Sequence, residues 1–151
     1  MQWELFERAT EAEAEDSDYR ADRNLARAAE FLAAFDISRR GFDCFTVGEG
    51  LRYDLIADIW GTRRIQVKMN HRAKYRARAS ISQSYTFGKS NDLRDYLGDI
   101  DLFAFVAMDR RQVLYGLPER MERSVLHMAA SKMTEEVCDL SWIDATRNWR
   151  V

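Results

Sequence analysis

The sequence contains few of the residues that build disulfides, structural metal sites or membrane spans. Cys44 and Cys138 are its two cysteines and lie outside any CxxC or Cys/His spacing, so we expect free thiols rather than a disulfide or a zinc site. The longest apolar run, 102–108, has seven residues, whereas a membrane-spanning helix needs roughly 20. The first residues lack the basic and apolar segments of a signal peptide. We therefore expect a cytoplasmic protein without a membrane partner.

The length of the chain predicts a single hydrophobic core. With 151 residues, of which 46% are hydrophobic, the chain can bury one core of ordinary size and has little left for a second. We divide it into an acidic N-terminal extension at 1–18, a core domain at 19–118, and a C-terminal extension at 119–151 that packs on the core.

Charge is distributed unevenly along the sequence. The formal net charge is −2, but residues 1–18 contain seven acids and one base. The segment 61–80 contains no acid and includes seven bases, which are Arg63, Arg64, Lys68, Arg72, Lys74, Arg76 and Arg78. A basic strip of this kind attracts phosphate backbones even when the total charge is near zero. The strip predicts a nucleic-acid surface, with an ordinary solvated face as the alternative.

Apolar periodicity predicts one long helix near the start of the chain. Within 18–38, apolar residues recur at steps of three and four, at Leu25, Ala28, Ala29, Leu32 and Phe35. Ser17 and Asp18 offer N-caps, and Gly41 offers a left-handed C-terminal cap. We expect the helix to occupy 18–38.

Strand patterns follow this helix. Runs rich in β-branched and aromatic residues predict strands at 42–47, 53–60, 64–70, 102–108 and 113–117. The second and third should form one hairpin and the last two another, which Pro118 would end. We also expect a strand at 77–82, a loop at 83–92, a short helix at 93–97, and helical segments at 121–132 and 134–138.

The first hairpin carries three polar residues that can form a site. Alternate side chains of a strand share a face, so Gln66 and Lys68 point to one side while Ile65 and Val67 face the core. Asp54 precedes them on the neighbouring strand, and whether it joins their face depends on the pairing of the two strands.

One register of the hairpin brings the three residues together. Asp54 shares the face of Lys68 if Ile56 lies opposite Lys68 and 61–63 forms a three-residue loop. A two-residue loop at 61–62 would place Asp54 on the other face. We therefore predict the three-residue loop.

Such a face can support phosphodiester hydrolysis. The reaction needs a hard cation on the phosphate, an activated water and neutralisation of developing charge. Asp54 can supply an anionic oxygen, and the Gln66 side-chain oxygen and the Val67 carbonyl can complete one side of a Mg²⁺ shell, in which Mn²⁺ can substitute. Lys68 can orient or activate the water, or neutralise the developing charge.

These residues resemble the core motif of the PD-(D/E)xK nuclease superfamily, in which an aspartate opens the second strand and an acid-x-lysine triplet lies in the third. Here Asp54 takes the first place and Gln66-Val67-Lys68 the second. The glutamine in place of the second acid resembles one branch of the superfamily, which contains an intron-encoded homing endonuclease. Members of this branch also carry a glutamate on a helix, upstream of a glycine. Glu30 precedes Gly41 by eleven residues and matches that place. The resemblance covers roughly residues 24–118.

The resemblance implies both a fold and an activity. The fold is of the α/β (α+β) class, with a restriction-endonuclease-like core in which helices flank a mixed β-sheet. The activity is that of a metal-dependent DNA endonuclease of the homing or restriction type. Glu30, Asp54, Gln66 and Lys68 would be catalytic, and Asp54, Gln66 and Val67 would bind Mg²⁺.

Contacts with double-stranded DNA should come from the basic strip and the segment that follows it. The predicted phosphate contacts are Arg63, Arg64, Arg72, Lys74, Arg76 and Arg78, and the predicted base contacts are Ser80, Ser82 and Gln83. A domain of this size has a short footprint, so we expect a dimer or tetramer. A bacterial protein of this kind would be associated with the nucleoid. The sequence does not separate DNA from RNA as the substrate.

Simpler interpretations stay open for each residue. Asp54 could cap the turn after 50–52, Glu30 could be a solvated helix residue, and Gln66 and Lys68 could be the exposed half of an edge strand. Two other functions also stay open. One is a junction or repair nuclease that recognises DNA structure, and the other is a catalytically inactive nuclease-like module for DNA binding or protein interaction.

Overall fold

The computed structural model describes residues 11–89 and 91–150, with side chains from residue 21 onward. The helices are α1 (Glu11–Arg39) and α2 (Glu135–Thr146), with short 3-10 helices η1 (Leu93–Tyr96), η2 (Pro118–Arg120), η3 (Ala130–Lys132) and η4 (Arg147–Trp149). The strands are β1 (Cys44–Thr46), β2 (Leu55–Asp58), β3 (Thr62–Asn70), β4 (Lys74–Tyr75), β5 (Gln83–Phe87), β6 (Leu102–Ala107), β7 (Gln112–Gly116) and β8 (Leu126–Ala129). None of the described helices is long and apolar enough to cross a membrane.

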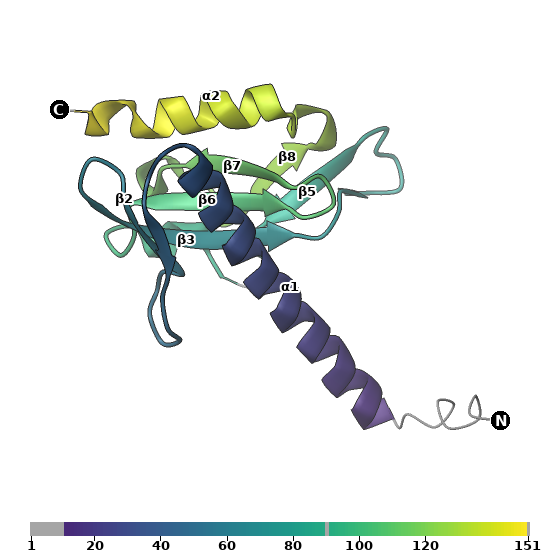
Figure 1. Ribbon diagram of the computed structural model, residues 1–151. Coiled ribbons are helices and arrows are strands. Elements are labelled where there is room, and N and C mark those ends of the chain that lie inside the picture. Colours follow the sequence, from purple (N-terminus) through teal and green to yellow (C-terminus); the bar gives the residue numbers. More distant parts are fainter. Residues whose placement is uncertain (1–10, 90, 151) are drawn as a thin grey trace.

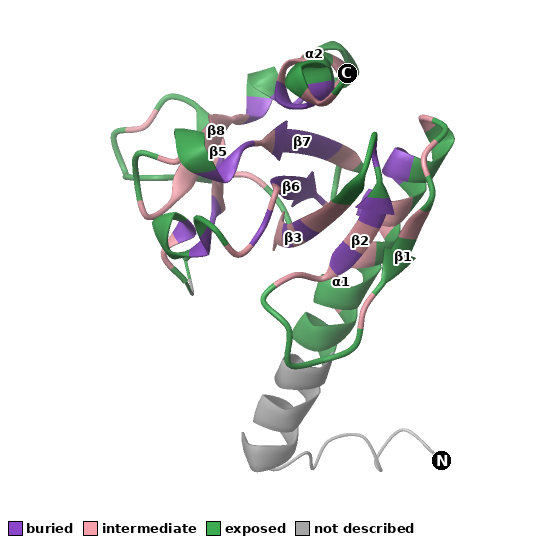
Figure 2. Cartoon of the chain, turned by 90° about the vertical axis from the view of Figure 1, so that its left-hand side faces the viewer, coloured by how far each residue is buried: buried purple, intermediate pink, exposed green. Residues whose placement is uncertain are grey.

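A five-stranded mixed sheet lies at the centre of the molecule (Figure 1). Its strand order is β1-β2-β3-β6-β7, in which β3 and β6 run parallel and the other neighbours run antiparallel. Helix α1 covers one face, η1 and a second sheet of order β4-β5-β8 cover the other, and α2 packs along the edge strand β7 with buried residues in the cores of both faces (Figures 1 and 2). Because a tight turn cannot join two parallel strands, the segment between β3 and β6 forms a long crossover.

Strand β6 is buried at all of its positions, since both faces of the sheet are covered there (Figure 2). Leu102 and Ala104 pack in the core on the side of α1. Phe103 and Phe105 pack on the opposite side, with η1 and the second sheet. The alternation follows the period of two of a strand, and the apolar run is typical of a strand buried on both faces.

Helix α1 packs on the sheet through small side chains. Ala29 and Ala33 are fully buried, whereas Phe31 and Phe35 expose 56% and 64% of their surface. The predicted apolar stripe is therefore wrong at Phe35 and at Ala28, which is also exposed. The close approach of α1 to the sheet leaves room for alanine at the contact and turns the larger rings away.

The two ends of α1 differ in how well the sequence predicts them. The C-terminal end is as predicted, with Gly41 in the left-handed region at a φ of +94°. The predicted caps at Ser17 and Asp18 are wrong, because the helix begins at Glu11 and runs through them. Alternating glutamate and alanine at 11–15 have high helix propensity and explain the extension.

The β2–β3 hairpin places the same side chains on one face as the predicted pairing does, but its register is different. Ile56 lies opposite Arg64 instead of Lys68. The loop is 59–61 rather than 61–63, because Ile59 turns into the core, where it is fully buried, and Gly61 takes a φ of +113° to close the turn. A loop of three residues is retained, so the same side chains share a face.

Several other elements are confirmed. Strand β1 lies within the predicted strand at 42–47, and η1 lies within the predicted helix at 93–97. The β6–β7 hairpin also forms where predicted, and Pro118 opens η2 directly after it.

The second half of the crossover and the C-terminal part depart from the prediction. Residues 77–82 contain no strand, 83–87 form β5 inside the predicted loop, and 126–129 form β8 inside a predicted helical segment. β5 and β8 pair with each other, and this pairing of distant segments has no local sequence signal. The predicted helical segment at 134–138 also continues as α2 to Thr146.

A polar cluster joins α1, β7 and α2. Asp36 is 8% exposed and accepts hydrogen bonds from the Tyr115 hydroxyl at 2.7 Å and from Arg40 Nε at 3.0 Å. Arg40 also donates to Asp139 Oδ1 at 2.6 Å. The Trp142 ring covers the cluster, with its centroid 4.9 Å from that of Tyr115 and 5.2 Å from the Arg40 guanidinium carbon. Trp142 therefore helps to bury the Arg40 guanidinium and the Tyr115 ring.

We predict that Trp142→Ala lowers the free energy of unfolding by about 3–5 kcal/mol, since it removes a side chain that is 5% exposed and leaves a cavity. Ile143→Ala is the matched control, because Ile143 neighbours Trp142 on α2 and is 52% exposed. Its change should stay within about 0.5 kcal/mol. Urea denaturation followed by circular dichroism measures both, and equal effects would show that α2 is not anchored by Trp142.

Candidate active site

Asp54 lies just before β2, where the backbone of β3 holds its carboxylate. Oδ2 accepts a hydrogen bond from the Val67 backbone N–H at 2.8 Å, and the Asp54 backbone N–H donates to the Ile65 carbonyl at 2.8 Å. The side chain thus bonds across the sheet instead of capping the turn after 50–52. Burial raises the pKa of Asp54, and the Val67 amide and the Lys68 ammonium partly offset that rise.

Glu30 reaches the same place from α1. Its pKa is raised by burial and then by the negative charge of Asp54, whereas Arg27 lowers it. Glu30 and Asp54 line a hollow of about 500 Å³ between α1 and the loop that precedes β2. Two neighbouring carboxylates whose ionised forms are disfavoured provide an arrangement that a bound cation would stabilise.

Gln66 and Lys68 share one face of β3, and Ile65 and Val67 are buried on the other, as predicted. Strand β3 lies between β2 and β6, so neither polar residue belongs to an edge strand. Extending the β2–β3 pairing by one position places Gln66 opposite Asp54. Gln66 Nε2 donates to the Val67 carbonyl at 3.2 Å, which orients the amide beside the carboxylate.

The Lys68 ammonium has a partner outside the predicted site. Nζ donates a hydrogen bond to the Tyr96 hydroxyl at 2.8 Å. Tyr96 lies on η1, 28 residues after Lys68, on the segment that crosses over to β6. No local pattern connects a tyrosine of a short helix with a lysine on an earlier strand, so sequence analysis did not select it.

The oxygen atoms around Asp54 fit a hard cation that takes few protein ligands. Glu30 and Asp54 supply carboxylates, while Gln66 and Val67 supply neutral oxygens beside them. Residues 21–89 and 91–150 contain no group of three or more His, Cys, Asp or Glu that could hold a metal. Mg²⁺ binds through one or two carboxylates and keeps several waters, so it fits this donor set.

A basic groove lies next to the two carboxylates. It has a volume of about 490 Å³, and its lining includes no acid and five basic side chains, which are Lys68, His71, Arg72, Lys74 and Lys89. Ala26 of α1 lines both this groove and the carboxylate hollow, so the two adjoin. An anionic chain in the groove would therefore run toward Asp54.

The basic strip of the sequence divides into two parts in the structure. Arg63 and Arg64, at the start of β3, bind groups of the protein itself. Arg63 donates to the Ile59 and Trp60 carbonyls at 3.2 and 3.0 Å and so holds the β2–β3 loop. Arg64 forms an ion pair with Asp101 at 3.2 Å. These two guanidinium groups stabilise the sheet and lie outside the groove lining.

The other predicted DNA contacts follow the far end of β3. Exposed residues of this set are Arg72, Lys74, Arg76, Arg78, Ser82 and Gln83, and Ser80 is partly buried. Of these, Arg72 and Lys74 line the basic groove, and the others lie on the 76–82 loop or at the start of β5. His71 and Lys89 also line the groove, and Lys89 was not among the predicted DNA contacts.

Comparisons with known proteins show the fold. No protein-family model matches the chain, and no curated protein matches it. Among solved structures, the chain is similar to a bacterial homing endonuclease, I-Ssp6803I, with a TM-score of 0.52 and 19% sequence identity. The likeness covers 68% of this chain and 71% of the homing endonuclease chain. The predicted nuclease-like α+β fold with a mixed sheet and flanking helices is therefore confirmed.

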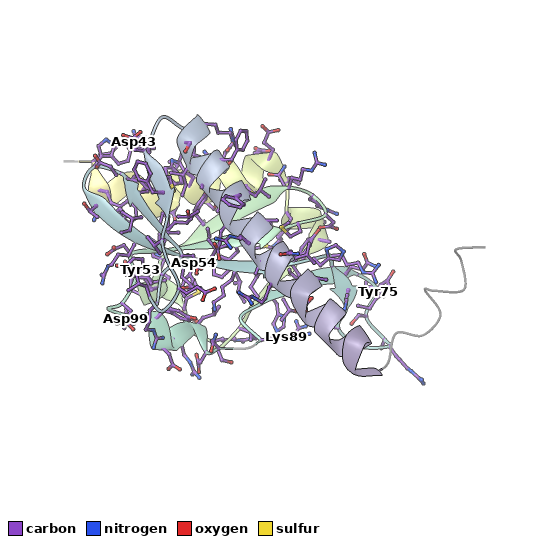
Figure 3. All side chains as sticks on the ribbon, turned by 60° about the horizontal axis from the view of Figure 1, so that its bottom comes forward. Asp43, Tyr53, Asp54, Tyr75, Lys89 and Asp99 are labelled. Atoms are coloured by element: carbon purple, nitrogen blue, oxygen red, sulfur yellow. The ribbon has the colours of Figure 1, made fainter. Side chains whose placement is uncertain are left out.

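We predict that Asp54→Asn lowers the pKa of Glu30, because it removes the negative charge that disfavours ionisation of Glu30. Asparagine keeps an oxygen that can accept the Val67 N–H. A carbon-13 NMR titration of the Glu30 carboxyl measures the shift. Asp43→Asn is the control, since Asp43 is exposed and lies away from Asp54 (Figure 3). A Glu30 pKa that is the same in all three proteins would contradict a shared carboxylate site.

Proposed function

We propose that the protein is a metal-dependent DNA endonuclease that hydrolyses phosphodiester bonds. The observation that carries the proposal is the placement of Asp54, beside Glu30 and within electrostatic reach of Lys68, where a hollow with two carboxylates adjoins a basic groove. An acidic centre beside a basic track suits a substrate that is a polyanion but reacts at one phosphate. The nuclease-like fold supports the same activity.

We assign the cation to Asp54, Gln66 and Val67, with Glu30 adjacent. The side-chain hydrogen bonds at the site use Asp54 Oδ2 and Gln66 Nε2, so Oδ1 and Oε1 are the atoms that can face a ligand. Bound Mg²⁺ or Mn²⁺ would supply positive charge for the scissile phosphate and lower the pKa of a water. The sheet backbone holds the Asp54 carboxylate in place before a ligand arrives, which reduces the cost of organising the site.

Lys68 and Glu30 would have separate roles in the hydrolysis, one in stabilising charge and the other in accepting a proton. The Lys68 ammonium would donate a hydrogen bond to a phosphate oxygen or to the attacking water, and it would stabilise the charge that develops there. Glu30 has a pKa above that of an ordinary glutamate, which suits a group that accepts a proton from the water. Both groups stand at Asp54, one on β3 and one on α1.

The DNA backbone would follow the basic groove. Arg72, Lys74 and Lys89 would contact phosphates there, and Arg76 and Arg78 would extend the track along the 76–82 loop. Ser80, Ser82 and Gln83 lie on or beside this loop and would reach bases. The predicted dimer or tetramer, and the choice among linear duplex, junction and RNA, stay predictions that sedimentation and cleavage assays can test.

We expect Mn²⁺ to bind the wild type in a calorimetric titration and not to bind Asp54→Ala, because the substitution removes the central anionic ligand. Asp43→Ala should bind like the wild type, since it deletes an exposed carboxylate elsewhere. The titration is repeated with DNA present, because a phosphate can complete the shell.

The same variants then test cleavage of randomised duplexes and four-way junctions. Asp54→Asn should abolish cutting, and Lys68→Ala should slow it by about 10²- to 10⁴-fold. A wild type that neither binds Mn²⁺ nor cleaves any substrate would contradict the proposal and favour an inactive DNA-binding module.

We also expect Lys74→Ala and Lys89→Ala to weaken binding to duplexes of unrelated sequence. Each lost phosphate contact should reduce the slope of log K against log salt by about one. Lys132→Ala is the matched control, because Lys132 is an exposed lysine of η3 outside the groove lining. Fluorescence anisotropy at several salt concentrations measures the slopes. A control slope that falls as much as the groove variants would show that the groove is not the DNA path.

A further inference from the structure

The Lys68 ammonium stands between two groups that can hold it. One is the Tyr96 hydroxyl, which accepts its hydrogen bond at 2.8 Å. The other is the Asp54 carboxylate, whose pKa the ammonium lowers through space. Among the ion pairs of the described side chains, none within 4.0 Å joins Lys68 to Asp54. The direct partner of Lys68 is therefore the neutral hydroxyl.

Tyr96 is itself held firmly. It is 6% exposed, and its ring packs edge-on against Phe103 with centroids 5.5 Å apart. The helix that carries it, η1, is anchored by the fully buried Leu93 and capped by Asp92, which accepts the Arg94 N–H at 2.9 Å. A phenol fixed in this way offers the ammonium a single position, which a mobile group would not do.

Arg52 also contacts the Tyr96 ring. Its guanidinium carbon lies 4.7 Å from the centre of the Tyr96 ring. An ion pair with Asp99 at 3.1 Å and a hydrogen bond to the Asp95 carbonyl at 3.1 Å fix the guanidinium there. The loop before β2, which leads into Asp54, is thus tied to the same helix that holds Lys68.

A lysine at a site of this kind needs such a restraint. Its ammonium ends a chain of four rotatable carbons and is attracted to any nearby carboxylate. Direct pairing with Asp54 would occupy the oxygen that the cation needs and neutralise its charge. A hydroxyl partner leaves the full positive charge on Lys68 and leaves the Asp54 carboxylate available.

We propose that Tyr96 is a positioning residue for Lys68, which keeps the ammonium directed at the reacting phosphate and away from Asp54. The inference rests on the proposed endonuclease function. Tyr96 does not itself touch the substrate in this scheme. Its effect passes through the Nζ–Oη hydrogen bond, and Arg52, held by Asp99, contacts its ring.

Tyr96→Phe tests the proposal, because it removes the hydroxyl and keeps the ring that packs on Phe103. Tyr85→Phe is the matched control. It deletes the same atom from the same hydrophobic cluster, where the Tyr85 hydroxyl donates to Asp109 at 2.8 Å, whereas Lys68 bonds to Tyr96. Single-turnover cleavage rates and DNA dissociation constants are measured for both variants with Mg²⁺.

We expect Tyr96→Phe to slow the cleavage step by about 10- to 100-fold, since a misplacement of about 1 Å at a reacting group can cost about 100-fold. Its DNA dissociation constant should stay within about twofold of the wild type, because the other four basic side chains of the groove keep their places. Tyr85→Phe should cleave at the wild-type rate. Equal rates for Tyr96→Phe and the wild type, or an equal loss in both variants, would overturn the proposal.

A second measurement does not depend on cleavage. The chain has four lysines, Lys68, Lys74, Lys89 and Lys132, so their ammonium signals can be separated in a nitrogen-15 NMR spectrum, and Lys68→Arg identifies the relevant one. The hydrogen bond should slow proton exchange and make the Lys68 signal visible in the wild type and in Tyr85→Phe. The signal should broaden in Tyr96→Phe. A Lys68 signal that is unchanged in Tyr96→Phe would overturn the proposal even in a protein that cleaves nothing.

Discussion

The parallel pairing of β3 with β6 is the constraint on which the rest of the structure depends. Parallel neighbours require the chain to return from the end of one strand to the start of the other, so residues 71–101 must cross a face of the sheet. The start of this crossover supplies the basic groove, and its end supplies η1 with Tyr96. The crossover thus brings both the basic surface and Tyr96 to Lys68. A hairpin in place of the crossover would have provided neither.

Burying the ionised carboxylates of the site costs free energy, which packing in the rest of the fold offsets. Burial disfavours the ionised forms of both Glu30 and Asp54, and each has a pKa above its ordinary value. Groups with raised acid pKa values reduce stability as pH rises through their titration range, because the folded state then loses protons that it binds more tightly than the unfolded state does. The packed alanines of α1 and the cluster under Trp142 stabilise the fold that holds these carboxylates. Such packing allows the fold to tolerate two carboxylates whose charges are unfavourable until a ligand binds them.

Local patterns in the sequence predicted those features that depend on neighbours along the chain. The C-terminal end of α1 at Gly41, the β6–β7 hairpin and the shared face of Gln66 and Lys68 all follow from periodicity or from a single cap. Prediction was wrong where distant segments decide the outcome. The residues of β5 look like a polar loop until β8 covers them, and the β2–β3 loop shifts because burial of Ile59 outweighs the turn preference of Gly61-Thr62. Tyr96 could not have been selected, since only the crossover brings it to Lys68.

Strand β6 has no position that faces water, and this limits how the protein can change over evolutionary time. A polar replacement at any of its positions would bury a group without a partner, at a cost of about 1–3 kcal/mol, which is a large share of the stability of a small domain. Substitutions can accumulate more freely on the exposed 76–82 loop and on the outer side of α1. Two descendants of one ancestor could therefore lose nearly all likeness in sequence while the strand arrangement persists. Their evolutionary relationship would then be detectable from a comparison of their three-dimensional structures and no longer from a sequence alignment.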